Sequence, residues 1–246
     1  MHYKDCYFMT IHITEKFSIY FGDASQSMSV DDIAQKNITL VLQNIAELVG
    51  AEQLIFLQQT HGVQGAVITD SHHDTQFLQQ SGDFIITNKK KSGIGVFTAD
   101  CLPIVLYDPV THSAGVVHAG WKGSAANIFV IAVQRIVQEF CSSVGDLQIY
   151  FGPAAGDCCY EVSSDFIDNF KQYGDIDAAF IKKSSKIFFN STIFTSIIAR
   201  NLGIKAKNIY TTYNVCTICT TSLCSYRREK EIDENWICSS KTSRRG

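Results

Sequence analysis

Three short segments of the chain carry side chains that bind soft or borderline metal ions. They are residues 58–62 with His61, residues 98–103 with Cys101, and residues 118–123 with His118. Each segment places one imidazole or thiol beside small residues at the end of a predicted strand, where loops commonly present functional groups on a rigid scaffold. Taken singly, a lone histidine is usually an ordinary polar residue, and a lone cysteine is usually a small apolar one. A three-ligand metal site is therefore one interpretation among several.

Two histidines and one cysteine suit Zn²⁺ in a catalytic arrangement whose fourth position is open to water or substrate. Zinc would lower the pKa of a bound water toward about 7. The same donors form the trigonal set of a blue-copper site, which favours an axial methionine. The methionines (Met1, Met9 and Met28) are remote from the three segments in sequence, and 7 histidines are few for a multicopper oxidase. Zinc is the favoured cofactor, copper is the alternative, and a metal-free pairing of Cys101 with a histidine stays open.

Composition excludes several classes of protein. The 246 residues are 46% hydrophobic and 18% charged, which is enough apolar material for a buried core and excludes a disordered chain. A net charge of −3 and a pI near 6.1 argue against a nucleic-acid partner. No apolar run approaches the roughly 18–20 residues of a membrane span. Nine cysteines without a signal-peptide pattern indicate reduced thiols or metal ligands and a cytoplasmic location.

The other cysteines carry a weaker metal signal. Cys216 and Cys219 have the CxxC spacing of a zinc site, but the next two cysteines, Cys224 and Cys238, are far apart in the sequence. No metal role is assigned to the adjacent pair at 158 and 159. Reduced, packed thiols are therefore the favoured interpretation.

Apolar patterning predicts few helices and many short strands. A capping-box pattern at Ser29 and Asp32 precedes an apolar stripe that ends at Gly50. Further helices are predicted over residues 124–140, after Ser163, and between Asn190 and Gly203. Strands are predicted over residues 18–21, 54–58, 66–69, 84–87, 95–98, 104–107, 115–118, 147–151 and 208–213. Because several strands are apolar on both faces, the prediction is a layered α/β (α+β) protein.

Five motifs occur in a fixed order along most of the chain: QQTHG, TADCLPIVLYDP, VVHAGWKG, GPAAGDCCYEV and SYRRE. Together they resemble the laccase-domain family, whose members were called multicopper polyphenol oxidases and are now regarded mainly as purine nucleoside phosphorylases with adenosine deaminase activity. The resemblance implies a layered αββα sandwich, with one domain over residues 1–246. It implies zinc held by His61, Cys101 and His118, and a purine nucleoside and phosphate as small-molecule partners.

The resemblance also implies substrate contacts. These are Asn37 on the first helix, Lys122 after the tryptophan of the third motif, and Tyr226, Arg227 and Arg228, which could meet an anion such as phosphate. Without the family, the two arginines would be an ordinary solvated pair. Family members usually have arginine where this chain has Ile38 and Lys122, and lysine does not replace arginine at a bidentate phosphate contact. The metal ligands therefore carry over more directly than the substrate contacts.

Asp100, next to Cys101, is a candidate general acid or base, or a group that orients a metal ligand. The alternative is a turn residue that hydrogen-bonds local backbone. The leading hypothesis is a zinc-dependent purine nucleoside phosphorylase, with adenosine deaminase as a second activity and Cys101 and Asp100 in the catalytic centre. A copper phenol oxidase and a degenerate member that binds nucleoside without turnover are the alternatives. The sequence leaves the oligomeric state open.

Overall fold

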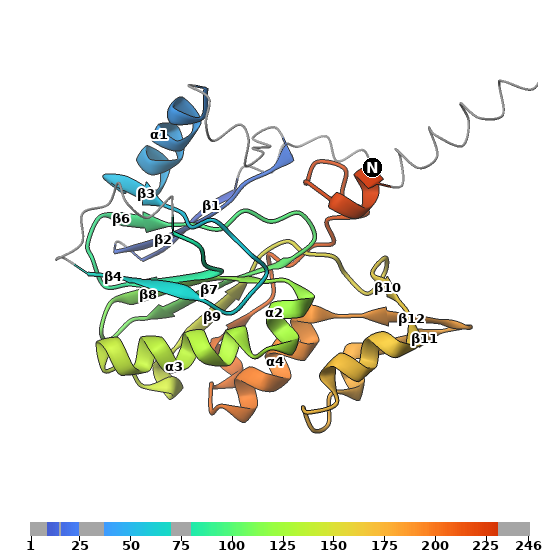
Figure 1. Ribbon diagram of the computed structural model, residues 1–246. Coiled ribbons are helices and arrows are strands. Elements are labelled where there is room, and N and C mark those ends of the chain that lie inside the picture. Colours follow the sequence, from blue (N-terminus) through green and yellow to red (C-terminus); the bar gives the residue numbers. More distant parts are fainter. Residues whose placement is uncertain (1–8, 15, 25–36, 70–79, 231–246) are drawn as a thin grey trace, which may run out of the picture.

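A six-stranded mixed sheet lies at the centre of the computed structural model, which describes residues 9–14, 16–24, 37–69 and 80–230 (Figure 1). The strand order is β13-β9-β7-β8-β5-β4. The two edge pairs, β4–β5 and β9–β13, are parallel, and the pairs between them are antiparallel. The strands are β4 (Gly65–Ile68), β5 (Phe84–Thr87), β7 (Leu102–Asp108), β8 (Ser113–Ala119), β9 (Gln148–Phe151) and β13 (Ile209–Tyr210).

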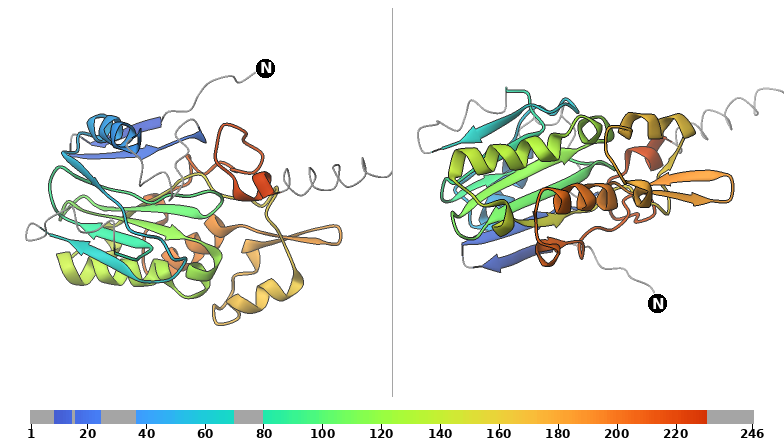
Figure 2. Two further views of the ribbon diagram at one scale, coloured as in Figure 1. Left: turned by 45° about the horizontal axis from the view of Figure 1, so that its top comes forward. Right: turned by 90° about the horizontal axis from the view of Figure 1, so that it is seen from below.

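Helices cover one face of this sheet (Figures 1 and 2). Ile86 of β5 and Val117 of β8 are fully buried here against Ile136 of α3. Helix α4 begins after Asn190, as predicted, and the Asn190 side chain caps it by accepting a hydrogen bond from the Ile193 amide at 2.9 Å. The helices are α2 (Trp121–Ala125), α3 (Ile128–Phe140) and α4 (Ser191–Asn201), with 3₁₀ turns η4 (Val144–Asp146) and η7 (Ala206–Asn208).

Two small sheets and helix α1 lie over the opposite face (Figure 1). Ile85 and Val116, the sequence neighbours of Ile86 and Val117, pack here against Ile55, because successive strand residues point to opposite faces. The elements are β1 (Met9–Thr14) paired with β2 (Phe17–Phe21), β3 (Gln53–Ile55) paired with β6 (Ser92–Ile94), and α1 (Asn37–Val49). The order of layers is therefore α, β, β, α, and the predicted layered α/β fold is confirmed.

A three-stranded antiparallel sheet, in the order β10-β12-β11, extends from one end of the sandwich. It is joined to the core by aromatic packing, since the Phe170 ring lies 5.1 Å from that of Phe189 and 5.0 Å from that of Phe194 on α4. Its elements are β10 (Glu161–Val162), β11 (Phe180–Lys183) and β12 (Lys186–Phe189), with 3₁₀ helices η5 (Ser164–Phe170) and η6 (Asp177–Ala179).

The structure differs from the predicted elements mainly at local breaks. The helix predicted over residues 124–140 is two helices, because Asn127 adopts a left-handed backbone with φ of 67°. The helix predicted after Ser163 is a 3₁₀ helix, and β6 ends where the strand predicted over 95–98 was to begin. Ser29 and Asp32 lie outside the described residues. Within the described part of the chain, no helix is long and apolar enough to cross a membrane.

Candidate metal centre

The three predicted metal ligands come together at one end of the layered sheets. His61 lies in the loop after β3, Cys101 directly precedes β7, and His118 lies near the end of the antiparallel neighbour β8. The ligand atoms of all three lie within 4.8 Å of one another. The two imidazole rings are 4.7 Å apart and nearly perpendicular, so one ion could meet both. His118 is buried, Cys101 is half-buried and His61 is exposed.

Asp83 organises this centre, and sequence reasoning missed it. Its fully buried carboxylate accepts a 2.8 Å hydrogen bond from His118 Nδ1, which leaves Nε2 as the nitrogen that can bind a metal. It also accepts hydrogen bonds from the amides of residues 60–62, which carry His61. A carboxylate behind a ligating histidine is the usual outer partner at zinc sites. The only sequence signal was an acidic residue directly before the apolar strand β5.

Hydrogen bonding controls the ionisation of Asp83. Burial raises the pKa of this carboxyl, but the hydrogen bonds from His118, Gly62 and Thr60 outweigh it, and the pKa lies well below its usual range. Asp83 is therefore an anion at neutral pH. Burial lowers the pKa of His61, and the nearby His118 lowers it further, so His61 favours the neutral form that binds metals. Burial, together with the charges of Asp100 and Asp83, raises the pKa of the Cys101 thiol to about 11.

Gly120 leaves the space between the three ligands open. A Cβ atom at this position would lie 3.1 Å from His61 Cδ2, 3.2 Å from Cys101 Sγ and 3.9 Å from His118 Cε1. A methyl group at this position would therefore press against the side chains of His61 and Cys101. Two imidazoles and one thiol beside this space are a donor set that would suit zinc.

The loops that carry His61 and Cys101 are tied together by a side chain. Gln59 Nε2 donates to the Phe97 carbonyl at 2.8 Å, and the Phe97 amide donates to Gln59 Oε1 at 2.7 Å. The side-chain amide thus makes both hydrogen bonds that a paired strand residue would make, just beyond the β3–β6 pair. The segments after β3 and β6 therefore still run together, although β3 ends before residue 58 and no strand forms over residues 95–98.

Asp100 connects the centre to the C-terminal segment. Its Oδ1 accepts a 2.6 Å hydrogen bond from the Thr217 hydroxyl, and its Oδ2 accepts a 2.8 Å bond from the Arg227 amide. Its partners are therefore remote in sequence, unlike those of a turn residue that bonds local backbone. The backbone of Asp100 has φ of 83° and that of His61 has φ of 58°, so both residues lie in the left-handed region.

The two predicted arginine contacts separate in the structure. Arg227 lines the same cleft as the three candidate metal ligands. Its guanidinium lies 4.3 Å from the centre of the Tyr160 ring and donates to the Glu161 carbonyl at 2.8 Å. Arg228 instead donates to four main-chain carbonyl oxygens of the 217–223 loop, those of Thr217, Ile218, Thr220 and Leu223. The structure therefore assigns Arg228 to holding this loop.

Of the remaining predicted contacts, Tyr226 and Lys122 lie near the centre. Tyr226 is exposed and lines the cleft. Lys122 is exposed on α2, with its Nζ 5.7 Å from the Trp121 ring and close enough to lower the pKa of His61. Asn37 is the first residue of α1, and its side chain lies outside the described residues.

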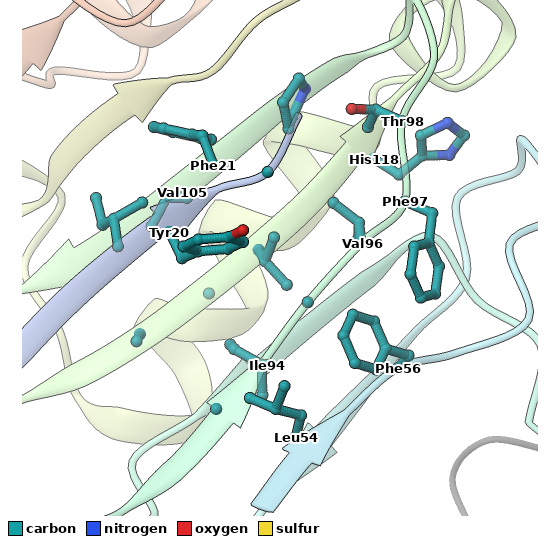
Figure 3. A pocket seen from close by; sticks show the side chains of 18 of the residues that line it. Tyr20, Phe21, Leu54, Phe56, Ile94, Val96, Phe97, Thr98, Val105 and His118 are labelled. Atoms are coloured by element: carbon teal, nitrogen blue, oxygen red, sulfur yellow. The ribbon is translucent and has the colours of Figure 1, made fainter. Parts of the chain in front are cut away.

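A cleft of about 2650 Å³ leads away from the ligands. It lies between the central sheet and the layer formed by β2, β3 and β6. In Figure 3, His118 and Thr98 lie at one end of this pocket and Leu54 lies at the other, with the stacked rings of Phe56 and Phe97 between them. A single small ligand usually fills about 300–1,000 Å³. A ligand bound at the metal centre would therefore occupy only the polar end of the cleft.

Known proteins resemble this chain over most of its length. The family model for the multi-copper polyphenol oxidoreductase laccase matches residues 18–234. A protein from Clostridium acetobutylicum named purine nucleoside phosphorylase is 31% identical over 218 residues, or 87% of this chain and 87% of its own. A protein from an unknown prokaryotic organism, named adenosine deaminase RL5, is 30% identical over 57% of this chain and 54% of its own.

The fold has a close counterpart among solved structures. The hypothetical protein YfiH of Bacillus licheniformis superimposes with a TM-score of 0.80 at 23% identity, covering 92% of this chain and 93% of that one. The two proteins therefore share this layered fold. The chain belongs to the multi-copper polyphenol oxidoreductase laccase family, and the resemblance inferred from the five motifs is confirmed.

Proposed function

We propose that the protein is a zinc-dependent purine nucleoside phosphorylase, with adenosine deaminase as a second activity. The observation that carries the proposal is the cluster of His61, Cys101 and His118 at the polar end of a cleft, with a buried carboxylate behind His118. The names of two relatives, purine nucleoside phosphorylase and adenosine deaminase, support the substrate class. Adenosine, inosine, guanosine and methylthioadenosine are the candidate nucleosides.

In this proposal, the two imidazoles and the Cys101 thiolate hold the zinc ion. When bound, zinc would supply Lewis acidity and would lower the pKa of a bound water toward about 7. Asp83 keeps the proton of His118 on Nδ1, so that Nε2 stays free to bind. The Asp83 bonds to the amides of residues 60–62 hold the His61 loop in position.

Phosphorolysis needs cationic and hydrogen-bonding groups near the ligands. A phosphate oxygen forms a bond to the anomeric carbon while the bond from that carbon to the purine nitrogen breaks, and the purine leaves with a proton. We assign the phosphate contact to Arg227, with Tyr226 in the same cleft and Lys122 near His61. From the family resemblance, we also propose Asn37 as a nucleoside contact. Asp100 lines the same cleft and is our candidate for the proton exchange. The aromatic rings of Trp121 and Tyr160 offer faces for the purine.

The test is a product assay with purified protein. Inosine or adenosine is incubated with phosphate, and chromatography follows the free base, ribose 1-phosphate and deaminated nucleoside. Adenine from adenosine reports phosphorolysis, whereas inosine reports deamination. We expect Cys101→Ala to lose activity at least about 100-fold. The matched control is Cys141→Ser, since Cys141 is an exposed free thiol outside the centre, and it should keep full activity.

Three outcomes would overturn parts of this proposal. Full activity in Cys101→Ala would exclude the three-ligand zinc mechanism. Copper in the purified protein, together with oxygen uptake on a phenol, would identify the phenol oxidase. Nucleoside binding without turnover in a zinc-loaded sample would identify a binding protein.

A further inference from the structure

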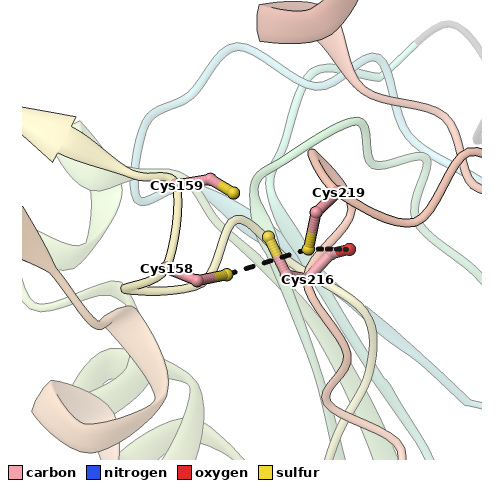
Figure 4. A group of neighbouring side chains, drawn as sticks. All are labelled: Cys158, Cys159, Cys216 and Cys219. Carbon is pink, nitrogen blue, oxygen red and sulfur yellow. Dashed lines mark hydrogen bonds between the residues drawn. The ribbon is translucent and has the colours of Figure 1, made fainter.

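Four cysteines gather at a second place, outside the centre described above (Figure 4). Cys158 and Cys159 lie in the turn between β9 and β10, and Cys216 and Cys219 lie in the segment after β13. All four sulfur atoms lie within 4.8 Å of one another. This grouping joins the CxxC pair to the adjacent pair for which sequence reasoning assigned no metal role. Of the cysteines that the CxxC pair suggested as partners, Cys224 is outside the group, and Cys238 lies outside the described residues.

The sulfur spacing fits a tetrahedral metal site. Zinc–sulfur bonds of about 2.3 Å in a tetrahedron place the sulfur atoms about 3.8 Å apart. Cys158 Sγ and Cys219 Sγ are 3.8 Å apart. A disulfide would need about 2.05 Å, and all four side chains are free thiols. Four thiolates are the donor set of structural zinc sites, and two of them here have C-x₂-C spacing.

Backbone groups support the cluster in the way that metal-bound thiolates require. The Gly156 amide donates to Cys216 Sγ at 3.3 Å. The Gly156 carbonyl accepts hydrogen bonds from the amides of Cys159 at 3.0 Å and Tyr160 at 2.8 Å, which shape the turn that presents the adjacent cysteines. The Cys216 carbonyl accepts from the Thr220 amide at 3.1 Å and closes the turn of the CxxC pair. Amide-to-sulfur hydrogen bonds stabilise ligand charge from outside the first coordination sphere.

We propose that Cys158, Cys159, Cys216 and Cys219 bind a second zinc ion with a structural role. The two segments that it would join both contact Asp100. The Ala155 amide donates to the Asp100 carbonyl at 2.9 Å, and the Thr217 hydroxyl donates to the Asp100 carboxylate at 2.6 Å. The same C-terminal segment continues to Arg227. The second ion would therefore hold the 217–228 segment against the cleft without taking part in chemistry, whatever reaction the cleft performs.

The experiment counts metal ions and thiolate ligands separately for the two sites. Zinc per chain is measured by elemental analysis in wild type, Cys101→Ala, the double variant Cys216→Ser/Cys219→Ser, and the control Cys141→Ser. We expect two zinc ions in wild type and the control, and one in each of the other proteins. Cys101→Ala is decisive if the double variant fails to fold, because it keeps the proposed site intact.

Cobalt then identifies the ligands of the remaining ion. Cys101→Ala loaded with Co²⁺ should show sulfur-to-cobalt charge transfer of the intensity expected for four thiolates. Alkylation of Cys158 and Cys219, the two exposed thiols of the cluster, should be slowed at least about tenfold by Zn²⁺. A metal-free Cys101→Ala protein would overturn the proposal. So would iron, or a disulfide among the four cysteines in freshly purified protein. Each result is independent of nucleoside turnover, so it is distinguishable from failure of the proposed function.

Discussion

Replacing Asp83 by asparagine tests whether this buried carboxylate positions the metal ligands. The side chain keeps its shape, but one of its two oxygen atoms becomes an NH₂ group that cannot accept a hydrogen bond. Oδ2 accepts from the Gly62 amide at 2.8 Å and from the Thr60 hydroxyl at 2.9 Å. Oδ1 accepts from His118 Nδ1 at 2.8 Å and the His61 amide at 2.9 Å. Either orientation of the new amide therefore leaves at least one buried donor without a partner.

The size of the effect follows from these contacts. A buried amide that loses its acceptor costs about 1–3 kcal/mol, and replacing an ionised acceptor with a neutral one weakens the bonds that survive. We therefore expect Asp83→Asn to lower the free energy of unfolding by about 2–4 kcal/mol. Loss of the outer carboxylate should weaken zinc binding about 10–100-fold. That change corresponds to about 1.4–2.7 kcal/mol.

Two measurements and a control distinguish a specific effect on the metal ligands from a general loss of stability. Urea unfolding gives stability, and competition with a chromophoric chelator gives the zinc affinity of the folded protein. The matched control is Asp108→Asn, another fully buried carboxylate, at the far end of β7 and about 20 Å along the strand from Cys101. It should keep zinc affinity, whatever its effect on stability. A folded Asp83→Asn protein that binds zinc within about twofold of wild type would refute the role of Asp83.

Three further predictions use the same assays. Gly120→Ala should weaken zinc binding at least about tenfold, because the new Cβ atom would crowd His61 and Cys101. Stability should change little, since the backbone of Gly120 (φ −66°) suits alanine. An unchanged zinc affinity would refute the claim that Gly120 keeps the space beside the ligands open. Arg228→Met should lower stability by about 2–4 kcal/mol and speed hydrogen exchange in the 217–223 loop, and an unchanged loop would exclude the holding role. Burial raises the pKa of Asp108, but hydrogen bonds from Ser142 and the Val110 amide outweigh it and hold the pKa below its usual range. The stability that Asp108 contributes should therefore be full above about pH 5 and fall as the pH drops below about 4, measured as the difference in unfolding free energy from Asp108→Asn; a difference that stays constant through pH 3 would refute this.

The central sheet was predictable because its strands are buried on both faces. Residues 84–87 and 104–107 read as apolar runs and lie within β5 and β7. The outer sheet of β10, β11 and β12 was missed because its strands are short, with only two residues in β10, and because lysines occupy half of β11. The break at Asn127 was hidden as well, because a left-handed residue does not interrupt the apolar pattern on either side of it.

The three ligands could be suggested from the sequence because each lies beside a predicted strand end. Their convergence depends on the antiparallel pairing of β7 and β8, which periodicity does not encode. The role of Asp83 could not be predicted for the same reason, since its partner His118 is 35 residues away in the sequence. The four-cysteine cluster joins two turns that pair only in the folded chain. That residues 1–246 form one domain stays a prediction.

The left-handed backbones of His61 and Asp100 have a consequence for how the candidate centre would bind a metal ion. A non-glycine residue in this region costs about 1–3 kcal/mol, and it persists only where surrounding contacts hold it. Here the Asp83 carboxylate holds the backbone around His61, and Thr217 and Arg227 hold Asp100, none of which involves an ion. The free energy needed to hold these backbones in the left-handed region is therefore offset by hydrogen bonds that form when the chain folds. We therefore expect metal to enter and leave the folded protein reversibly, without a rearrangement of these loops.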